Sequence, residues 1–412
     1  MNKIKNSIVS GAAFAWGLFG AGATSAWAQD QPPAGEQPAA EEPAAPTSPL
    51  IAPSITGPLA IQLPPNKYDM GPLGDIYVDG IGSGLFQWQN NVVPNVLPGN
   101  RAALWDLSNG QVFVQKTDGL VQFYAQAGAY SVPDLGVPYA SAALATWGSQ
   151  SPTGNLWGWF PQGFLKIAPT DNFSIQGGKL PTLMGAEYTF SFENINIQRG
   201  LLWNQENAVN KGVQGNYTIG PVALSLAFTD GFDSGVYNWV TGSATYTLDS
   251  SNSFVFFGGG NAGSTNKNTL RTPLLQSNSQ VYNLIYTYNS DPWIIQPYFQ
   301  ATHVPTNNKV GITSSASTFG GAVLANYSLG GGFNLGGRLE YIGTTGNNNL
   351  LYGPGSGAFS ISLTPTFQYS HFFARGEVSW VKANGITSGA GFGSNGTNTS
   401  QTRILIETGI LF

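Results

Sequence analysis

From about residue 75 to the end of the chain, apolar and polar side chains alternate at every second position in runs of roughly ten residues. In the run 359–369, Phe359 and Ile361 fall on one face, while Ser360 and Ser362 fall on the other. Side chains of a β-strand point to opposite faces in turn, so the pattern predicts strands with one apolar and one polar face. Earlier runs are less regular.

Connections between these runs are short and long in turn. The short ones are 117–119, 169–171, 220–221, 249–251, 290–292, 330–332 and 370–371. Most contain the Gly, Pro, Asp or Ser residues that tight hairpins favour. Seven hairpins, an opening run near 76–88 and a closing run that reaches Phe412 predict sixteen strands. Both ends of the predicted sheet then lie on the side of the short turns.

Composition narrows the class of protein. The 412 residues include no Cys, 54 Gly, 13% aromatic and only 9% charged residues, against about 25% charged residues in an average soluble domain. Mean hydropathy is −0.06, and beyond the N-terminus no apolar run approaches the roughly 20 residues of a membrane-spanning helix. An all-β transmembrane antiparallel β-barrel of about sixteen strands fits these values, because lipid-facing and lumen-facing residues average out along each strand.

The N-terminal part predicts secretion followed by a tether. Residues 1–28 combine a basic start, an apolar centre and a small-residue cleavage motif that ends at Ala28, which is typical of a signal peptide. Residues 29–66 are rich in Pro and Ala and predict a disordered periplasmic linker, although a segment that docks on the cell wall or plugs a pore is an alternative. Residues 67–412 form the predicted barrel.

The last run ends the chain on an aromatic residue. Phe412, Ile410, Ile406 and Ile404 share one face of the predicted strand. This pattern resembles the closing strand of bacterial outer-membrane β-barrels, where a terminal Phe also serves as the membrane-assembly signal. The alternative is an ordinary half-buried strand at the end of a soluble sandwich, which has the same period.

Charged residues gather on the polar faces of three late strands. They are Arg338 with Glu340, Arg375 with Glu377, and Arg403 with Glu407. These strands become near neighbours when the sheet closes, so charges of both signs share one inner wall. One hypothesis is that they form half of a transverse field that sets ion preference. The other is that they are ion pairs that hold the wall together.

A long connection, residues 181–210, separates the fifth and sixth predicted strands, and we expect it to be the longest. It carries Glu187, Glu193 and Arg199 among bulky apolar residues, so we expect it to fold into the lumen and set its width. In the transverse-field hypothesis, its acids face the wall charges from the opposite side of the constriction.

Several segments resemble a known family. NINIQRGLLWNQENAVNKGVQGNYTIG, LSLAFTDGFDSGVYNWVTGSATY and FVFFGGGN lie between residues 193 and 261, and HFFARGEVSWVKA lies at 371–383. They are similar to the β-barrel porins of the OmpL-like group. The resemblance implies an outer-membrane, porin-like pore for small solutes, with no catalytic residues, no cofactor and no metal.

The predicted function is therefore passive diffusion of small hydrophilic solutes or ions across the outer membrane of a Gram-negative-type bacterium. Expected partners are outer-membrane lipid and lipopolysaccharide, the barrel assembly machinery and, by analogy with general porins, two further copies in a homotrimer. Basic residues are too sparse for nucleic acid. The alternative is a non-conducting barrel that acts as an adhesin, an anchor or a sheath for a partner protein.

Overall fold

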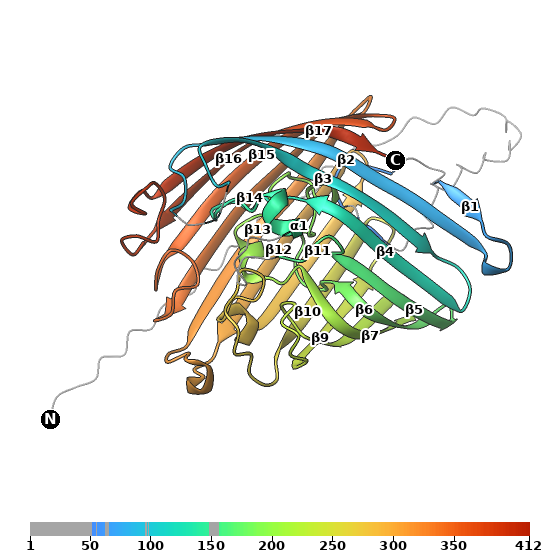
Figure 1. Ribbon diagram of the computed structural model, residues 1–412, viewed down its shortest axis with the longest axis horizontal. Helices are drawn as coiled ribbons and strands as arrows, with labels where there is room; N and C mark the ends of the chain where they lie inside the picture. Colours follow the sequence, from blue (N-terminus) through green and yellow to red (C-terminus); the bar gives the residue numbers. More distant parts are fainter. Residues whose placement is uncertain (1–51, 55, 62–65, 95–96, 98, 148–155) are drawn as a thin grey trace, which may run out of the picture. The chain divides into compact units, whose positions relative to one another are not determined.

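The computed structural model describes residues 52–54, 56–61, 66–94, 97, 99–147 and 156–412, all within one compact unit of the chain. The predicted signal peptide and most of the predicted linker lie outside the described residues. The described chain forms a closed antiparallel barrel, whose long connections lie toward the left of Figure 1 and whose short turns lie toward the right.

Sixteen strands make up the barrel, as the alternation predicts. They are β2 (Asp75–Gln89), β3 (Ala103–Lys116), β4 (Val121–Tyr130), β5 (Gln162–Thr170), β6 (Phe173–Pro181), β7 (Val209–Ile219), β8 (Val222–Thr229), β9 (Trp239–Thr247), β10 (Asn252–Asn261), β11 (Gln280–Ser290), β12 (Trp293–Val304), β13 (Ala316–Gly330), β14 (Phe333–Gly346), β15 (Gly357–Tyr369), β16 (Phe372–Asn384) and β17 (Ser400–Leu411). Each pairs with the next, and β17 pairs with β2, from Arg403 opposite Gln89 to Leu411 opposite Ile81. Closure leaves no unpaired strand edge.

Smaller elements decorate this barrel. Strand β1 (Lys67–Asp69) pairs with the start of β2, and the others are η1 (Gly71–Leu73), α1 (Ala142–Trp147), η2 (Ser191–Glu193), η3 (Leu202–Gln205), η4 (Gln276–Asn278) and η5 (Asn308–Val310). In the described residues, no helix is long and apolar enough to span a membrane.

All seven predicted short turns connect neighbouring strands. The prediction for the long connections is wrong in one respect: residues 131–161, between β4 and β5, form a longer connection than residues 182–208, between β6 and β7. The longer one includes α1 and follows strands whose alternation is less regular, which obscured its bounds.

The outer face of the barrel is apolar, and the inner face is polar. Phe359, Ile361 and Leu363 of β15 are exposed on the outside, while Ser360 and Ser362 are buried on the inside. Aromatic pairs across neighbouring strands, such as Trp293 with Tyr327, whose ring centroids lie 4.6 Å apart, add to the outer surface. Such a surface suits contact with lipid.

The run 253–257, which is apolar on both faces, has a simple explanation. Phe254 and Phe256 are exposed on the outer face, whereas Phe257 points inward and is fully buried. Inside the barrel, Phe257 packs with Met184 and Phe232, which belong to two of the long connections. An apolar inward residue therefore marks a place where a loop, rather than water, covers the wall.

The C-terminus closes the barrel beside the start of β2. The backbone N–H of Phe412 donates to the carbonyl of Gly80 at 2.9 Å, and the N–H of Gly80 donates to the carbonyl of Phe412 at 2.7 Å. A Cβ at Gly80 would lie 2.7 Å from the Phe412 ring. The terminal ring thus packs directly on the backbone of β2, and a side chain at position 80 would displace it.

Candidate functional site: the lumen and its infolded loop

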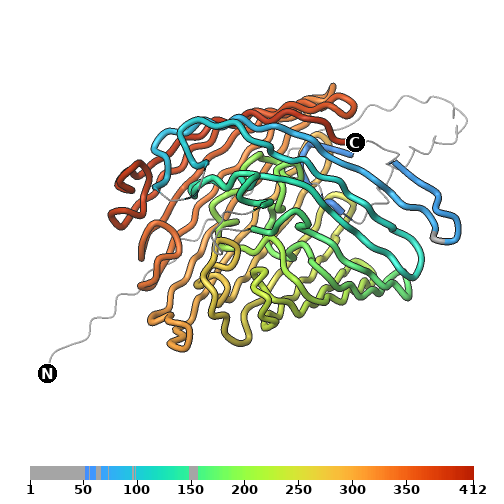
Figure 2. The backbone as a smooth tube through the Cα atoms, in the orientation of Figure 1, coloured from blue at the N-terminus to red at the C-terminus, as the bar shows by residue number. Residues whose placement is uncertain are grey.

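The connection between β6 and β7, residues 182–208, lies inside the ring of strands, as the sequence predicts (Figure 2). We call it the infolded loop. Nearly all of its residues are buried, including Phe190, Phe192, Ile197 and Leu202. A loop that enters the lumen must find hydrogen-bond partners for its backbone, because it forms no strand there.

Wall carboxylates bind backbone N–H groups of the infolded loop. Glu340 of β14 accepts hydrogen bonds from the N–H groups of Leu201 and Leu202, both at 2.7 Å. Glu377 of β16 accepts from the N–H groups of Ile197 and Gln198. Each of these two carboxylates, which were predicted to point inward, thus binds the N–H groups of two consecutive loop residues.

Wall arginines bind the loop carbonyls. Arg375 of β16 donates to the carbonyls of Ser191, Asn194 and Ile195 at 2.7 to 2.9 Å. Arg338 of β14 donates to the carbonyl of Gln198 at 2.7 Å. Guanidinium groups carry five donors in a fixed plane, so one arginine satisfies several carbonyls at once.

The connection 131–161 is held in the same way. Arg403 of β17 donates to the carbonyls of Asp134 and Val137. Arg199 of the infolded loop forms a 2.6 Å ion pair with Asp134 and donates to the carbonyl of Thr189. The two long connections are therefore joined to each other as well as to the wall.

The remaining predicted charges also lie in this contact zone. Glu407 of β17 accepts from Ser191 at 2.8 Å and lies 3.7 Å from Arg375. Glu193 accepts from the N–H of Phe190 at 2.9 Å. Glu187 forms a 2.6 Å ion pair with Arg338, so this loop acid touches the wall base and is not separated from it by an open constriction.

All nine predicted site residues are brought together, and each is at most 3% exposed. They are Glu187, Glu193, Arg199, Arg338, Glu340, Arg375, Glu377, Arg403 and Glu407. Seven of them lie where the infolded loop or its neighbour contacts the strands β14–β17, whereas Glu193 and Arg199 lie on the infolded loop and bind Phe190 and Asp134. Their effect on ion preference stays a prediction.

Wall glycines allow the infolded loop to approach closely. A Cβ at Gly336 of β14 would lie 2.9 Å from Ile195 Cγ2, and a Cβ at Gly320 of β13 would lie 2.5 Å from Leu202 Cδ2. Larger residues at these positions would displace the loop from the wall. The loop is thus placed by shape as well as by charge.

Part of the predicted linker enters the lumen. We call residues 52–54 and 56–61 the strap. At one end, Ala52 exchanges hydrogen bonds with the Gln115 side chain of β3, and at the other end Ala60 exchanges them with the Gln368 side chain of β15. Both glutamines lie close to the short turns that follow their strands.

Between its ends, the strap packs against the infolded loop. Thr56 donates to the carbonyl of Glu193 through both its N–H, at 2.9 Å, and its hydroxyl. Leu59 is 2% exposed and belongs to an apolar cluster that includes Phe192 and Phe373. For this stretch, the contacts match the alternative of a segment inside the pore and not a free spacer.

Burial changes the acidity of two loop carboxyls. It raises the pKa of Glu193 from its ordinary value to about 8. Burial, with a further contribution from the charge of Glu187, raises the pKa of Glu206 to about 8. Glu206 accepts a hydrogen bond from the Tyr298 hydroxyl at 3.1 Å, while its Oε2 atom is buried and has no hydrogen-bond partner among the described residues.

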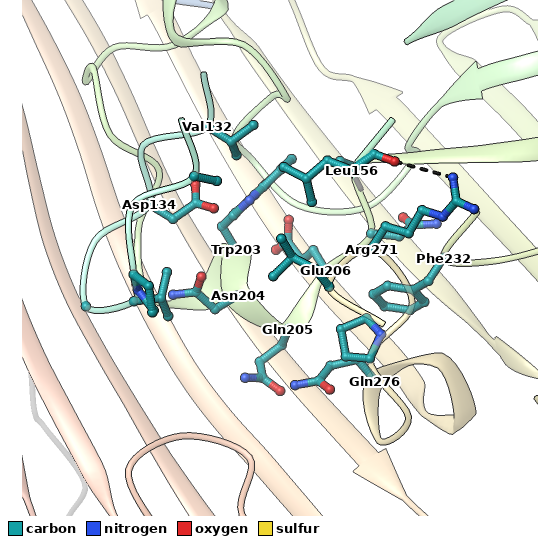
Figure 3. Close-up of a pocket in the computed structure, with 18 of the residues that line it drawn as sticks. Val132, Asp134, Leu156, Trp203, Asn204, Gln205, Glu206, Phe232, Arg271 and Gln276 are labelled. Carbon is teal, nitrogen blue, oxygen red and sulfur yellow. Dashed lines mark hydrogen bonds between the residues drawn. The ribbon is translucent and has the colours of Figure 1, made fainter. Parts of the chain in front are cut away.

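A cavity of about 510 Å³ opens on the side of the long connections. Trp203 and Glu206 of the infolded loop and Phe232 and Arg271 of other connections line it (Figure 3). Arg271 donates to the carbonyl of Leu156 and forms an ion pair with Asp233. Apolar residues make up much of the lining, and the infolded loop contributes to its inner boundary.

The opposite mouth has a second cavity, of about 620 Å³, at the short-turn ends of β4–β7. Inward-facing residues Gln122, Lys166, Ser174 and Asn216 line it together with residues of the short turns. Among the described residues, no loop covers the inner wall here: Thr218 of β7 is exposed although it points inward.

Sequence reasoning missed Asp134 and Lys166, and it gave a linker segment that plugs the pore only as an alternative to a spacer. The strap gave no signal, because it binds through backbone groups that every residue has. Asp134 lies in a connection whose path is not set by any periodic pattern. Lys166 did give a signal, since it is a charged residue at an inward position between Leu165 and Ile167, which are both exposed on the outside.

Solved outer-membrane proteins share this fold. An anion-selective porin from Comamonas acidovorans aligns with a TM-score of 0.56 and 11% identity, over 82% of this chain and 99% of the porin. Outer-membrane expressed OmpT of Vibrio cholerae aligns with a TM-score of 0.54 and 11% identity, over 82% and 98%. The outer-membrane channel DcaP of Acinetobacter baumannii aligns with a TM-score of 0.52 and 11% identity, over 83% and 99%. At these identities, the likeness concerns the fold alone.

No curated protein sequence matches the chain. A protein-family model does, over residues 75–412, which comprise the whole barrel from the first residue of β2. The family is described as "Putative beta-barrel porin-2, OmpL-like". The chain belongs to this family of outer-membrane β-barrel porins.

Proposed function

We propose that the protein is a channel through which small hydrophilic solutes or ions diffuse passively across the outer membrane. The observation that carries this proposal is the partly exposed polar wall at the short-turn ends of β5–β9, part of which lines the cavity of about 620 Å³, beside the infolded loop. A polar inner wall lets water and hydrated solutes pass, and the loop limits their size.

In this proposal, the nine charged residues of the contact zone act by placing the infolded loop. Their hydrogen bonds fix where its backbone lies, and the loop position sets the free width of the lumen. They would influence charge preference through the field that reaches the remaining opening. The nine are Glu187, Glu193, Arg199, Arg338, Glu340, Arg375, Glu377, Arg403 and Glu407.

Conductance of the purified protein in a planar bilayer under a salt gradient tests the proposal. We expect stepwise openings with a linear current–voltage relation. Folding is checked on the same sample by gel mobility, because a folded barrel migrates faster before heating than after it. A folded barrel that gives no current would overturn the channel proposal.

The lumen also supports a second candidate, a non-conducting barrel that acts as an adhesin, an anchor or a sheath for a partner protein. The observation in its favour is that the infolded loop and the strap together cover the inner faces of β14–β17. The same experiment separates the two functions. A silent, folded barrel would direct attention to what the long connections bind.

We further propose secretion with cleavage near Ala28, assembly by the outer-membrane barrel machinery through the Phe412 strand, and contact with lipid and lipopolysaccharide. A homotrimer fits the fold, since one solved form of OmpT from Vibrio cholerae is described as a trimer, at a TM-score of 0.51 and 10% identity. Mass measurement of the purified protein in detergent tests the subunit number.

A further inference from the structure

The uncovered part of the inner wall contains very little charge. Strands β5–β9 are described throughout, and their inward positions near the short turns hold Ala168, Thr218, Ala223 and Ser225. Lys166 is the one charged residue among the inward positions of these five strands. A solute that follows this wall therefore meets a single formal charge on it.

The strand geometry places Lys166 on the lumen side. Its neighbours Leu165 and Ile167 are 51% and 45% exposed on the outer face, so Lys166 must point inward. It pairs across the strands with Gln176 of β6, another inward polar residue, and both Lys166 and Gln122 line the cavity of about 620 Å³. The ammonium group thus belongs to a wet, polar part of the lumen.

No partner neutralises this ammonium group within the described part of the chain: Lys166 forms neither an ion pair nor a hydrogen bond there. The other two lysines of these strands differ. Lys179 donates to the carbonyls of Trp157 and Phe160, and Lys211 forms a 2.7 Å ion pair with Asp233. Lys166 is left half-buried with its charge directed at the lumen.

The acidic residues that line this cavity lie on the short turns. Asp118 forms a 2.6 Å ion pair with Lys116, and Asp171 lies on the exposed turn between β5 and β6. Both are at the rim of the cavity, whereas Lys166 lies further along β5, inside it. A charge inside a narrow space with low-dielectric walls acts more strongly on a passing ion than a charge on a hydrated rim.

We propose that Lys166 is the specificity-determining residue of the channel, and that it favours small hydrophilic anions such as chloride and short carboxylates. The inference rests on the proposed channel function. The unpaired ammonium group attracts anions. Neutral hydrogen-bonding groups that replace part of the hydration shell of an anion come from Gln122, Ser174 and Asn216. Cations meet the same charge as a barrier.

Reversal potentials in a potassium chloride gradient test this inference. The wild-type channel should prefer chloride, Lys166→Gln should lower the chloride-to-potassium permeability ratio by a few-fold, and Lys166→Glu should make the channel prefer potassium. Lys309→Gln is the matched control, because it removes the same charge from an exposed turn between β12 and β13.

The outcomes separate this inference from the channel proposal. Currents that show the same reversal potential in wild type, Lys166→Gln and Lys166→Glu would overturn the role of Lys166 and leave the channel intact. A wild-type preference for potassium would also overturn it. Absence of current in every folded variant would instead contradict the channel itself. Gel mobility before and after heating confirms that each variant is folded.

Discussion

Two sides of the barrel wall are built from strands with the same alternation but face different surroundings. On β14–β17, the inward side chains include six buried charges, Arg338, Glu340, Arg375, Glu377, Arg403 and Glu407. On the short-turn half of β5–β9, inward residues are small and partly exposed, and the only charge is Lys166. We call these the filled side and the open side.

The difference shows what inward charge does in this barrel. On the filled side, charged groups replace water as partners for a loop backbone that has no strand to pair with. On the open side, water itself satisfies the wall, and uncharged Ser, Thr and Asn side chains suffice. A dense group of inward charges therefore marks where a long connection packs against the wall. A single unpaired charge marks where a solute in the lumen meets the electric field of that charge.

Removing a wall arginine should have the largest effect, because it breaks the filled side. Arg338→Met deletes the 2.6 Å ion pair with Glu187 and leaves that carboxylate buried. Breaking one partner of a buried pair costs about 3–5 kcal/mol, so we expect the free energy of unfolding in detergent and urea to fall by about that amount.

The double variant Arg338→Met/Glu187→Gln should recover part of this loss, because position 187 no longer carries a buried charge without its arginine. Glu340, which lies 3.7 Å from Arg338, still lacks its partner, so the recovery is incomplete. Arg101→Met, at an exposed position between β2 and β3, is the control and should unfold like the wild type. If Arg338→Met is as stable as Arg101→Met, the ion pair does not hold the infolded loop.

Displacing the strap should enlarge the opening with a smaller loss of stability. A Cβ at Gly57 would lie 2.3 Å from the carbonyl oxygen of Asn194, so Gly57→Val forces the strap away from the infolded loop. We expect single-channel conductance to rise roughly 1.5- to 2-fold, because conductance grows with open area. Ala60→Val adds methyl groups at an exposed strap position and should leave conductance unchanged.

An unchanged conductance in Gly57→Val, with the strap shown to be displaced by faster proteolysis of residues 52–61, would mean that the strap does not restrict the path. The strap would then contribute only to packing around Leu59.

The sequence predicted the scaffold well for a physical reason. Strand period, hairpin turns and lipid-facing residues are local properties, and so Phe359 and Ile361 could be assigned to the outer face without a structure. The inward positions of Arg338 and Glu377 followed from the same alternation. Bulky apolar residues in the connection after β6 also predicted that this connection enters the lumen.

The partners of those charges could not be predicted in the same way. Glu187 and Arg338 are 151 positions apart in the chain, and their contact depends on the path of an irregular loop. The strap binds Gln115 and Gln368 through backbone groups, which composition does not reveal. Local patterns thus predicted the wall, whereas the filling of the lumen is set by long-range contacts.

A large side chain on the open side should narrow the path without affecting the fold. Ala223 of β8 points inward and is exposed, so a larger residue has room. We expect Ala223→Trp to lower single-channel conductance by roughly a third to a half, because it obstructs part of the opening. Ala244→Trp, on the outer face of β9, is the matched control and should conduct like the wild type. Equal currents in both variants would show that solutes do not follow this wall.

The smallest expected effect concerns pH, and it extends the comparison to the infolded loop itself, which buries Glu206 beside Tyr298 of β12. The pKa of Glu206 is raised by burial from its ordinary value of 4.5 to about 8. Between pH 4.5 and pH 8, the Glu206 carboxyl keeps its proton when the loop is docked and releases it when the loop is undocked. The free energy of docking is therefore most favourable below about pH 4.5. It weakens by about 1.4 kcal/mol per pH unit as the pH rises toward 8.

We expect the temperature of the gel-mobility transition to fall between pH 5 and pH 9 in the wild type. In Glu206→Gln the fall should be smaller, since an amide cannot ionise and can keep the hydrogen bond from the Tyr298 hydroxyl. Glu193 has a similarly raised pKa and should account for part of the remaining fall. Asp171→Asn, on an exposed turn, should behave like the wild type. An identical fall in Glu206→Gln and the wild type would mean that Glu206 does not couple loop docking to pH.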